Sequence, residues 1–259
     1  MTRYLVASLL IHNVDAYLPL FNYFMKSLTQ SNRFYYNIDH LIITDSSDLK
    51  LNWKTCFANT YIHIVDKDAS LKNALLHKLD IVNFDKLLTY NKILYLDVDF
   101  IIHGDLQDIF RLRVPKNRLV ATEEGVIDGQ FWTLDLYTQQ ELKELKRARV
   151  KSFNSGIFMF RPSIDLIHHF KECHRIGLNH NGSHFYDQSY FNYYFNVHKI
   201  SLCSQSFEDL YVMVKAWEKK KPNLKEIVKD TIMLYHVGGF NNPENKLKWM
   251  KKMLHRIKN

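Results

Sequence analysis

The stretch Lys92-Ile-Leu-Tyr-Leu-Asp-Val-Asp99 decides the fold and the chemistry expected of this chain. Residues 92–96 are mostly apolar, which is typical of a parallel β-strand buried on both faces of a sheet. The strand is predicted to end at Asp97, and residues i and i+2 of an extended chain project to the same side. We therefore expect Asp97 and Asp99 to present two carboxylates to one point beyond the end of a buried strand.

Two carboxylates so close together repel each other, and a divalent cation relieves that repulsion. Mg²⁺ or Mn²⁺ would also bind the diphosphate of a nucleotide substrate. The simpler interpretation makes one aspartate a helix cap and the other a solvated side chain. The buried strand before the pair favours a metal site.

An alternative enzyme class carries the same local pattern. Phosphatases of the haloacid dehalogenase type also have Asp-x-Asp after a strand, and their first aspartate is a nucleophile. In those enzymes the motif usually closes the first strand of the chain, whereas about three strands are predicted before Asp97. A metal-dependent phosphohydrolase stays open as the alternative.

Strand and helix patterns alternate before the motif. Strands are expected at residues 4–11, 38–44 and 61–65, and helices at 16–28 and 70–82, with Asp15 and Ser70 as caps. This order predicts an α/β fold with an open, mostly parallel central sheet flanked by helices. Ligands of such sheets bind beyond the carboxyl ends of the strands, where Asp97 lies.

The second half of the chain is less regular. Strands are predicted at residues 118–122, 157–160 and 231–235, and helices at 134–149, 163–174 and 244–257. Taken alone, Asn154-Ser155-Gly156 is typical of a turn. We expect one domain over residues 1–259, with two halves at 1–104 and 105–259, of which the first ends just after Asp97 and Asp99.

Composition limits the class of protein. The chain has 259 residues, of which 46% are hydrophobic, so it can bury a sizeable core. No apolar run approaches the roughly 20 residues that cross a bilayer. The three cysteines form no CxxC pair, so we predict neither disulfides nor a zinc site, and a reducing, cytoplasmic setting.

The positive charge is concentrated near the C-terminus. Residues 211–259 hold 12 Lys and Arg against 4 Asp and Glu, which accounts for the whole net charge of +8. Trp217 and Trp249 near these lysines do not form a nucleic-acid motif, so no nucleic acid is expected as a partner. The last helix is basic and amphipathic, and we expect it to pack on its own domain rather than on an anionic membrane surface.

Four ordered motifs resemble glycosyltransferase family 8, the group of glycogenin and the lipopolysaccharide galactosyltransferases. They are residues 78–99 with Asp97 and Asp99, residues 153–158, Asp187-Gln188, and His236-Val-Gly-Gly239. The resemblance covers roughly residues 3–245, and it implies a nucleotide-binding half at 1–104 and a sugar and acceptor half at 105–259. It implies a GT-A fold, which is a Rossmann-like α/β domain, and transfer of a hexose or pentose of glucose, xylose or galactose type. It also implies a UDP-sugar donor, retention of anomeric configuration, and Mn²⁺ with Mg²⁺ as the alternative ion.

The resemblance also implies roles for individual residues. The metal ligands are Asp97, Asp99 and His236, and the catalytic residues are Lys78, Asp187 and Gln188. The nucleotide-binding residues are Ile11, Asn13, Tyr17, Val98, Gly239 and Lys246. The sugar-binding residues are Lys78, Glu124, Asn154, Ser155, Asp187 and Gln188. Without the resemblance, Lys78 is more simply a solvated helix lysine and Tyr17 a core contact.

Asp187 and Gln188 carry the mechanism implied by the resemblance. Cleavage of the donor builds positive charge on the sugar ring, and a carboxylate or amide oxygen stabilises it. Asp187 could form a covalent intermediate, or the acceptor could attack on the face that UDP leaves. Both routes stay open at this point.

Two positions depart from the family pattern. Glu124 stands where the family usually has an aspartate, and Asn242 stands where its closing motif has a lysine. Lys246 or Lys248 is expected to supply the missing charge. If neither does, the chain is a catalytically weak, carbohydrate-binding relative. The acceptor is unidentified and could be a protein, a glycan or one of the 15 tyrosines of the chain itself, and a homodimer is compatible with the sequence.

Overall fold

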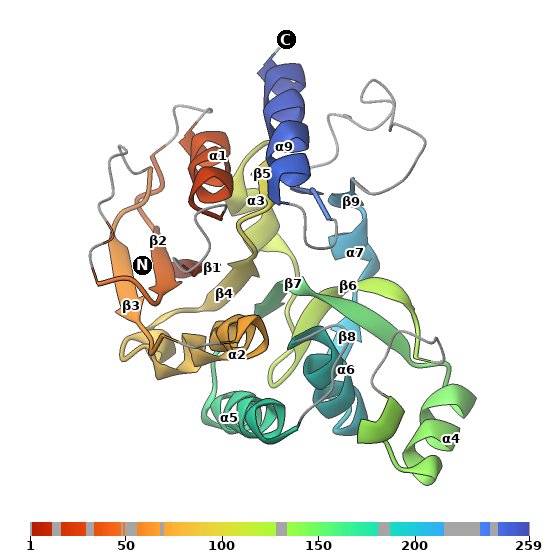
Figure 1. Cartoon of the computed structure of the whole chain (residues 1–259). Helices are drawn as coiled ribbons and strands as arrows, with labels where there is room; N and C mark the ends of the chain where they lie inside the picture. The colour runs from red at the N-terminus through yellow and green to blue at the C-terminus, as the bar shows by residue number, and fades with distance from the viewer. Residues whose placement is uncertain are drawn as a thin grey trace.

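The computed structural model describes residues 2–11, 17–29, 34–47, 49, 56–67, 70–127, 134–180, 187–214, 234–238 and 243–258. A seven-stranded sheet in the order β3-β2-β1-β4-β7-β6-β8 forms its centre (Figure 1). The strands are β1 (Tyr4–Leu10), β2 (Ile38–Thr44), β3 (Thr60–Ile64), β4 (Lys92–Leu96), β6 (Leu119–Val126), β7 (Lys151–Phe160) and β8 (Ser201–Cys203). β7 runs antiparallel to β4 and β6, and the other neighbouring pairs are parallel. The prediction of a mostly parallel sheet is confirmed.

Helices cover both faces of the sheet (Figure 1). One face carries α1 (Tyr17–Thr29), α3 (Leu106–Arg111) and α9 (Pro243–Lys258), with a small sheet of β5 (Phe100–Ile102), β10 (Leu234–His236) and β9 (Tyr211–Met213). The other face carries α2 (Leu71–Leu76), α5 (Ile164–Asn179), α6 (Asp187–Val197) and the 3₁₀ helix η1 (His77–Asn83). The remaining elements are η2 (Leu87–Thr89), η3 (Leu134–Leu136), α4 (Gln139–Arg147) and α7 (Gln205–Glu208).

Successive side chains of a central strand point alternately into two separate hydrophobic cores. Along β4, Leu94 and Leu96 pack toward α1, whereas Ile93 and Tyr95 pack toward α5 and α6. Alternation of this kind follows from the two-residue period of an extended chain. The continuous apolar run at residues 92–96 is therefore explained by burial on both faces.

Three predicted helices have clearly different bounds in the structure, and the one predicted at 163–174 continues to Asn179. The helix predicted at 70–82 is α-helical only to Leu76 and continues as the 3₁₀ helix η1. The helix predicted at 134–149 begins at Gln139, because Thr138 and Glu141 form a capping box that satisfies the first backbone donors. Tyr137, which was predicted to be part of this helix, lies just before the cap and is buried.

The turn interpretation of Asn154-Ser155-Gly156 is wrong. These residues are part of β7, a ten-residue strand of which only residues 157–160 were predicted. Their backbone is held in the extended form by groups distant in sequence. The Phe153 N–H donates to Asn192 Oδ1 at 2.8 Å, and the Asp97 N–H donates to the Gly156 carbonyl at 2.9 Å.

The basic C-terminal helix packs on its own domain. Met250, Met253 and Leu254 on α9 are buried in the core shared with α1. Among the described segments, no helix combines the length and the apolar composition that crossing a bilayer requires.

Candidate active site

The candidate site lies where the strand order of the sheet reverses. β2 and β3 follow on one side of β1, and β4 follows on its other side. A crevice beyond the carboxyl ends of the strands at such a point is the usual ligand site of an open α/β sheet. Ile11 directly follows β1 and Asp97 directly follows β4.

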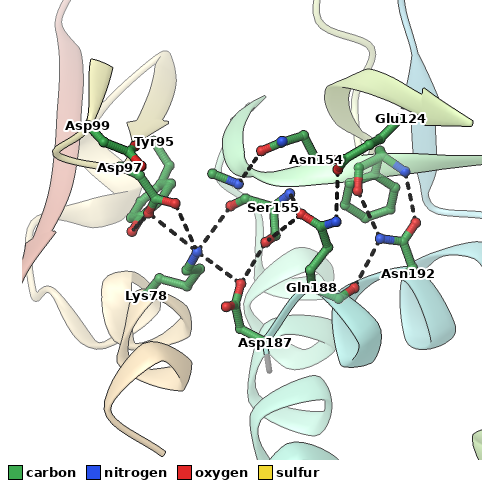
Figure 2. A network of polar contacts seen from close by, with 12 residues as sticks. Lys78, Tyr95, Asp97, Asp99, Glu124, Asn154, Ser155, Asp187, Gln188 and Asn192 are labelled. Atoms are coloured by element: carbon green, nitrogen blue, oxygen red, sulfur yellow. Dashed lines mark hydrogen bonds and ion pairs between the residues drawn. The ribbon is translucent and has the colours of Figure 1, made fainter. Parts of the chain in front are cut away.

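Lys78 is the centre of a buried polar network (Figure 2). Its side chain, on η1, is almost completely buried. The ammonium lies 2.9 Å from Asp187 Oδ2 and 3.3 Å from Asp97 Oδ1, and it donates to the Ser155 carbonyl at 3.4 Å. One cation therefore connects the end of β4, the middle of β7 and the start of α6. The interpretation of Lys78 as a solvated helix lysine is wrong.

Charge explains how an ammonium stays ionised in this position. Burial on its own lowers the pKa of Lys78, but the charges of Asp187 and Asp97 outweigh it, and the net pKa is raised. Burial raises the pKa of Asp187, and the nearby charge of Lys78 offsets part of that rise. The two groups are thus an interdependent buried ion pair, each of which needs the other to remain charged.

Asp99 is the centre of a second cluster. The Lys246 ammonium, from α9, donates to Asp99 Oδ2 at 2.6 Å, and His236 Nε2 lies 3.3 Å from Asp99 Oδ1. Burial raises the pKa of Asp99, but the charges of Lys246 and His236 more than offset burial and hold it well below its usual range. Lys246 therefore places a positive charge beside Asp99, whereas Lys248 is exposed.

The two aspartates are not arranged as the alternation argument predicted. β4 ends at Leu96 and residues 98–99 form a turn, so the i, i+2 rule of an extended chain does not apply. Asp97 turns to Lys78 and accepts from the Tyr95 phenol at 2.7 Å, while Asp99 turns to His236 and Lys246. Within the described residues, the ligand atoms of Asp97, Asp99 and His236 are not all within 4.8 Å of one another.

Asp99 and His236 nevertheless fit a divalent cation. Asp99 Oδ1 is buried and makes no full hydrogen bond among the described residues, although His236 Nε2 lies 3.3 Å away, so this oxygen can still accept a cation. The His236 Nδ1 lies 3.1 Å from the Tyr211 hydroxyl, so Nε2 is the nitrogen turned to Asp99. Metal-binding histidines are usually held by such a second contact. One imidazole among carboxylates suits Mn²⁺ better than Mg²⁺.

The amide of Gln188 is fixed at both ends. Its Nε2 donates to Glu124 Oε2 at 2.8 Å, and its Oε1 accepts from the Ser155 N–H at 3.1 Å (Figure 2). The Ser155 hydroxyl donates to Asp187 Oδ2 at 2.6 Å. Glu124 has the reach for this contact because its side chain is one methylene longer than the aspartate expected there.

β7 passes very close to Asp97. An added Cβ at Gly156 would lie 2.6 Å from Asp97 Oδ2 and 3.0 Å from Asn154 Oδ1. Asn154 is itself buried, and its Oδ1 accepts from the Gly156 N–H at 2.8 Å. Any side chain at this position would therefore displace Asp97 or Asn154.

The predicted nucleotide-binding residues are only partly described. Ile11 and Val98 are buried, and Tyr17 is half-buried at the start of α1. Burial lowers the pKa of Lys246, but the charge of Asp99 outweighs burial and the net pKa is raised. Asn13 and Gly239 lie outside the described residues.

Three residues at the site were missed at the sequence level. Tyr95 binds Asp97, Tyr211 binds His236, and Asn192 binds both backbone groups of Phe153. The two-residue period of β4 could have placed Tyr95 beside Asp97. Nothing in the sequence connects Tyr211 with His236.

A family model and three solved structures are similar to this chain. The model of Glycosyl transferase family 8 matches residues 8–241. No curated protein sequence matches. The apo structure of the bifunctional glycosyltransferase WbbM is 13% identical, with a TM-score of 0.62 over 98% of this chain and 52% of WbbM.

The other two structures share the same fold. GlyE, a glycosyltransferase of Streptococcus pneumoniae TIGR4, is 15% identical, with a TM-score of 0.59 over 99% of this chain and 63% of GlyE. The galactosyltransferase LgtC, solved with donor and acceptor sugar analogs, is 14% identical, with a TM-score of 0.60 over 98% of this chain and 95% of LgtC. The chain thus spans about half of WbbM and less than two thirds of GlyE.

Proposed function

The chain belongs to glycosyl transferase family 8 and is a glycosyltransferase, and from that premise we propose that it moves a hexose or pentose from a UDP-sugar to an acceptor with retention of anomeric configuration. The family match leaves no support for the phosphohydrolase alternative. The donor sugar is of glucose, xylose or galactose type.

The observation that carries this proposal is the position of Lys78 between Asp97 and Asp187. A donor bound here has its diphosphate near Asp97 and its sugar near Asp187. The Lys78 ammonium then lies where it neutralises charge on both parts. A buried cation of this kind needs no reorganisation when charge develops, which is how fixed charges assist catalysis.

Mn²⁺ is the proposed cofactor, with Asp99, His236 and Asp97 as its ligands. Bound there, it would act as a Lewis acid on the departing diphosphate. Asp97 is the most exposed of the three, with 31% of its side chain exposed, so it is the ligand best able to adjust its rotamer. Lys246 would release Asp99 to the ion and take a phosphate oxygen, supplying the charge that Asn242 does not.

Asp187 and Gln188 are proposed to stabilise the positive charge on the sugar ring. Gln188 can do so through its oxygen, because its nitrogen donates to Glu124 Oε2 and its oxygen, which accepts from the Ser155 N–H, has a second lone pair. Asp187 is held by Ser155 and Lys78 and so is suited to a fixed electrostatic role. Glu124 and Asn154 are proposed to select the sugar through its hydroxyls.

The acceptor is proposed to be a glycan, by analogy with LgtC, which was solved with an acceptor sugar analog. A protein acceptor and the chain's own tyrosines are the alternatives. The free cysteines Cys56, Cys173 and Cys203 support a reducing, cytoplasmic setting.

The proposal is tested by hydrolysis of UDP-sugars in the absence of an acceptor. Wild type with Mn²⁺ is expected to release UDP from one sugar of a panel that includes UDP-glucose, UDP-galactose and UDP-xylose. Asp187→Asn and Asp99→Asn are each expected to lower that rate by at least about 100-fold, as loss of a transition-state contact does. Calorimetry should show that UDP binding depends on Mn²⁺.

Asp85→Asn is the matched control, because Asp85 is an exposed aspartate away from the site. It should hydrolyse the donor at the wild-type rate. UDP binding of equal strength with and without Mn²⁺, or full activity in Asp99→Asn, would contradict the proposal.

A further inference from the structure

A cluster of two histidines and one aspartate lies outside the candidate active site. It consists of His77 and Asp80 on η1 and His174 on α5, and we call it the His77 cluster. Asp80 Oδ2 lies 2.6 Å from His77 Nδ1, and Asp80 Oδ1 lies 3.3 Å from His174 Nδ1. Within the described residues, this is the set of three ligand-type side chains whose ligand atoms are all within 4.8 Å of one another.

The 3₁₀ geometry of η1 explains why these side chains converge. A 3₁₀ helix has three residues per turn, so side chains at i and i+3 lie directly above each other. His77, Asp80 and Asn83 are spaced in this way, and the Asn83 amide donates to Asp80 Oδ1 at 2.9 Å. The row faces α5, which packs against η1.

Two members of the cluster are buried, and the third, the half-buried His174, has one ring nitrogen without a partner among the described residues. His77 is 9% exposed and Asp80 is 7% exposed. His174 Nε2 is buried and has no hydrogen-bond partner among the described residues. A buried nitrogen in that state costs about 1–3 kcal/mol unless something binds it. Burial raises the pKa of Asp80, but hydrogen bonds from His174 and His77 more than offset burial, so the carboxylate stays charged and available as a ligand.

We propose that the His77 cluster binds a divalent transition-metal ion of the Zn²⁺ class, in a site separate from the donor site. Two imidazoles and one carboxylate are a common ligand set for Zn²⁺ and a poor one for Mg²⁺. Bonds of about 2.0–2.2 Å put the ligand atoms of one ion up to about 4 Å apart, so small rotamer changes close the set. A fourth position remains for water.

The ion would strengthen the contact between α5 and η1, the 3₁₀ helix that carries Lys78. Lys78 directly follows His77 in η1. Leu76, which directly precedes His77, packs tightly against α5, because an added Cβ on Gly177 would lie 2.7 Å from Leu76 Cδ2. His174 lies one turn before Gly177 on α5. An ion shared by η1 and α5 therefore holds the backbone of Lys78 against the helix behind it.

Metal binding to the full chain tests this proposal independently of transferase activity. The background variant Asp97→Ala/Asp99→Ala removes the proposed donor-site ligands. After treatment with a chelator, it is titrated with ZnCl₂ in a calorimeter and with CoCl₂ in a spectrophotometer, without nucleotide. We expect one ion per chain, an intense visible Co²⁺ spectrum, and a higher melting temperature with Zn²⁺, since a ligand of the native state stabilises it.

His174→Gln in the same background should weaken Zn²⁺ binding at least about tenfold and abolish the Co²⁺ spectrum. His77→Gln is the second variant if His174→Gln does not fold. His198→Gln is the matched control, because His198 is exposed at the end of α6. Absence of binding in the background variant would overturn the proposal. So would binding that survives His174→Gln and disappears in His198→Gln, which would place the ion on exposed histidines.

Discussion

At the scale of single residues, the site is built from charges that neutralise one another. Lys78 compensates Asp97 and Asp187, and Lys246 compensates Asp99. Each carboxylate that the proposed donor and metal would use is therefore already paired with a lysine ammonium of the protein. Binding must exchange these contacts, so the affinities of metal and nucleotide depend on the lysines.

Lys246→Met tests this exchange. Mn²⁺ no longer has to displace an ammonium from Asp99, so we expect it to bind about tenfold more tightly in the absence of nucleotide. Affinity for UDP at saturating Mn²⁺ should fall, because the proposed phosphate contact is lost. The metal-free variant should lose about 3 kcal/mol of stability, since a buried carboxylate has lost its partner.

Both affinities can be measured by calorimetry and the free energy of unfolding by urea titration. Lys248→Met, an exposed lysine on the same helix, should match wild type in all three. Weaker Mn²⁺ binding in Lys246→Met would mean that Lys246 assists the ion instead of competing with it.

Gly156→Ala tests the close approach of β7 to Asp97. The added methyl meets Asp97 Oδ2 at 2.6 Å, and that partly exposed side chain can move away. We expect a stability loss of about 1–2 kcal/mol, as for modest overpacking, and a fall in kcat of about 100-fold, since a displacement near 1 Å has such an effect.

The measurements are urea unfolding and steady-state UDP release. Ser152→Ala is the control on the same strand. It removes a buried hydroxyl that has no hydrogen-bond partner among the described residues, so it should leave both quantities unchanged. A Gly156→Ala enzyme with wild-type kcat would show that Asp97 need not hold its present position.

At the scale of elements, the first half of the fold was predictable and parts of the second half were not. β2 and β4 have the predicted bounds because their apolar runs reflect burial on both faces of a parallel sheet. β7 was predicted short because its polar centre, Asn154-Ser155-Gly156, is held by partners on α6 and β4. α6 was not predicted at all, because it is buried nearly all round and its apolar residues give no clear 3.6-residue period.

Asn192 is the residue through which α6 holds β7. Its amide donates to the Phe153 carbonyl and accepts from the Phe153 N–H, both at 2.8 Å, and it donates to the Gln188 carbonyl at 3.0 Å. Asn192→Leu keeps the branched shape and the number of side-chain heavy atoms and removes these bonds. We expect a loss of about 2–4 kcal/mol in urea unfolding, because two buried backbone groups lose their partners.

Asn179→Leu, at the exposed end of α5, should change the free energy of unfolding by no more than about 0.5 kcal/mol. In Asn192→Leu we also expect slower UDP release at saturating donor, because Ser155 and Gln188 shift with their elements. Unchanged stability would mean that water replaces the amide at Phe153.

At the scale of the whole molecule, the site gathers residues from five distant segments. Lys78, Asp97, Gly156, Asp187 and His236 come from η1, the end of β4, β7, α6 and β10. Ordered motifs predicted that these residues belong to one site. They did not predict which residues pair, because that depends on the turn at residues 98–99 and on the place of Lys246 on α9. The His77 cluster was not predicted from the sequence, because it depends on the packing of α5 against η1.

The stability of the whole molecule should depend on pH through one core histidine. His40, on β2, is fully buried among Phe21, Phe24 and Phe57, and burial lowers its pKa to about 3. The unfolded chain binds a proton at this residue near pH 6.5, whereas the folded chain stays neutral. The contribution of His40 to stability is therefore present above pH 6.5 and lost as the pH falls toward 3.

Between pH 7.5 and pH 5 this residue alone should remove about 2 kcal/mol from the free energy of unfolding. His40→Gln can keep the hydrogen bond that His40 Nε2 makes with the Ser8 hydroxyl at 2.9 Å but does not titrate. Urea unfolding at a series of pH values should give a shallower decline for His40→Gln than for wild type. His168→Gln, an exposed histidine on α5, should follow the wild-type curve. Parallel curves for wild type and His40→Gln would mean that His40 takes up its proton in the folded state, which requires water to reach this part of the core.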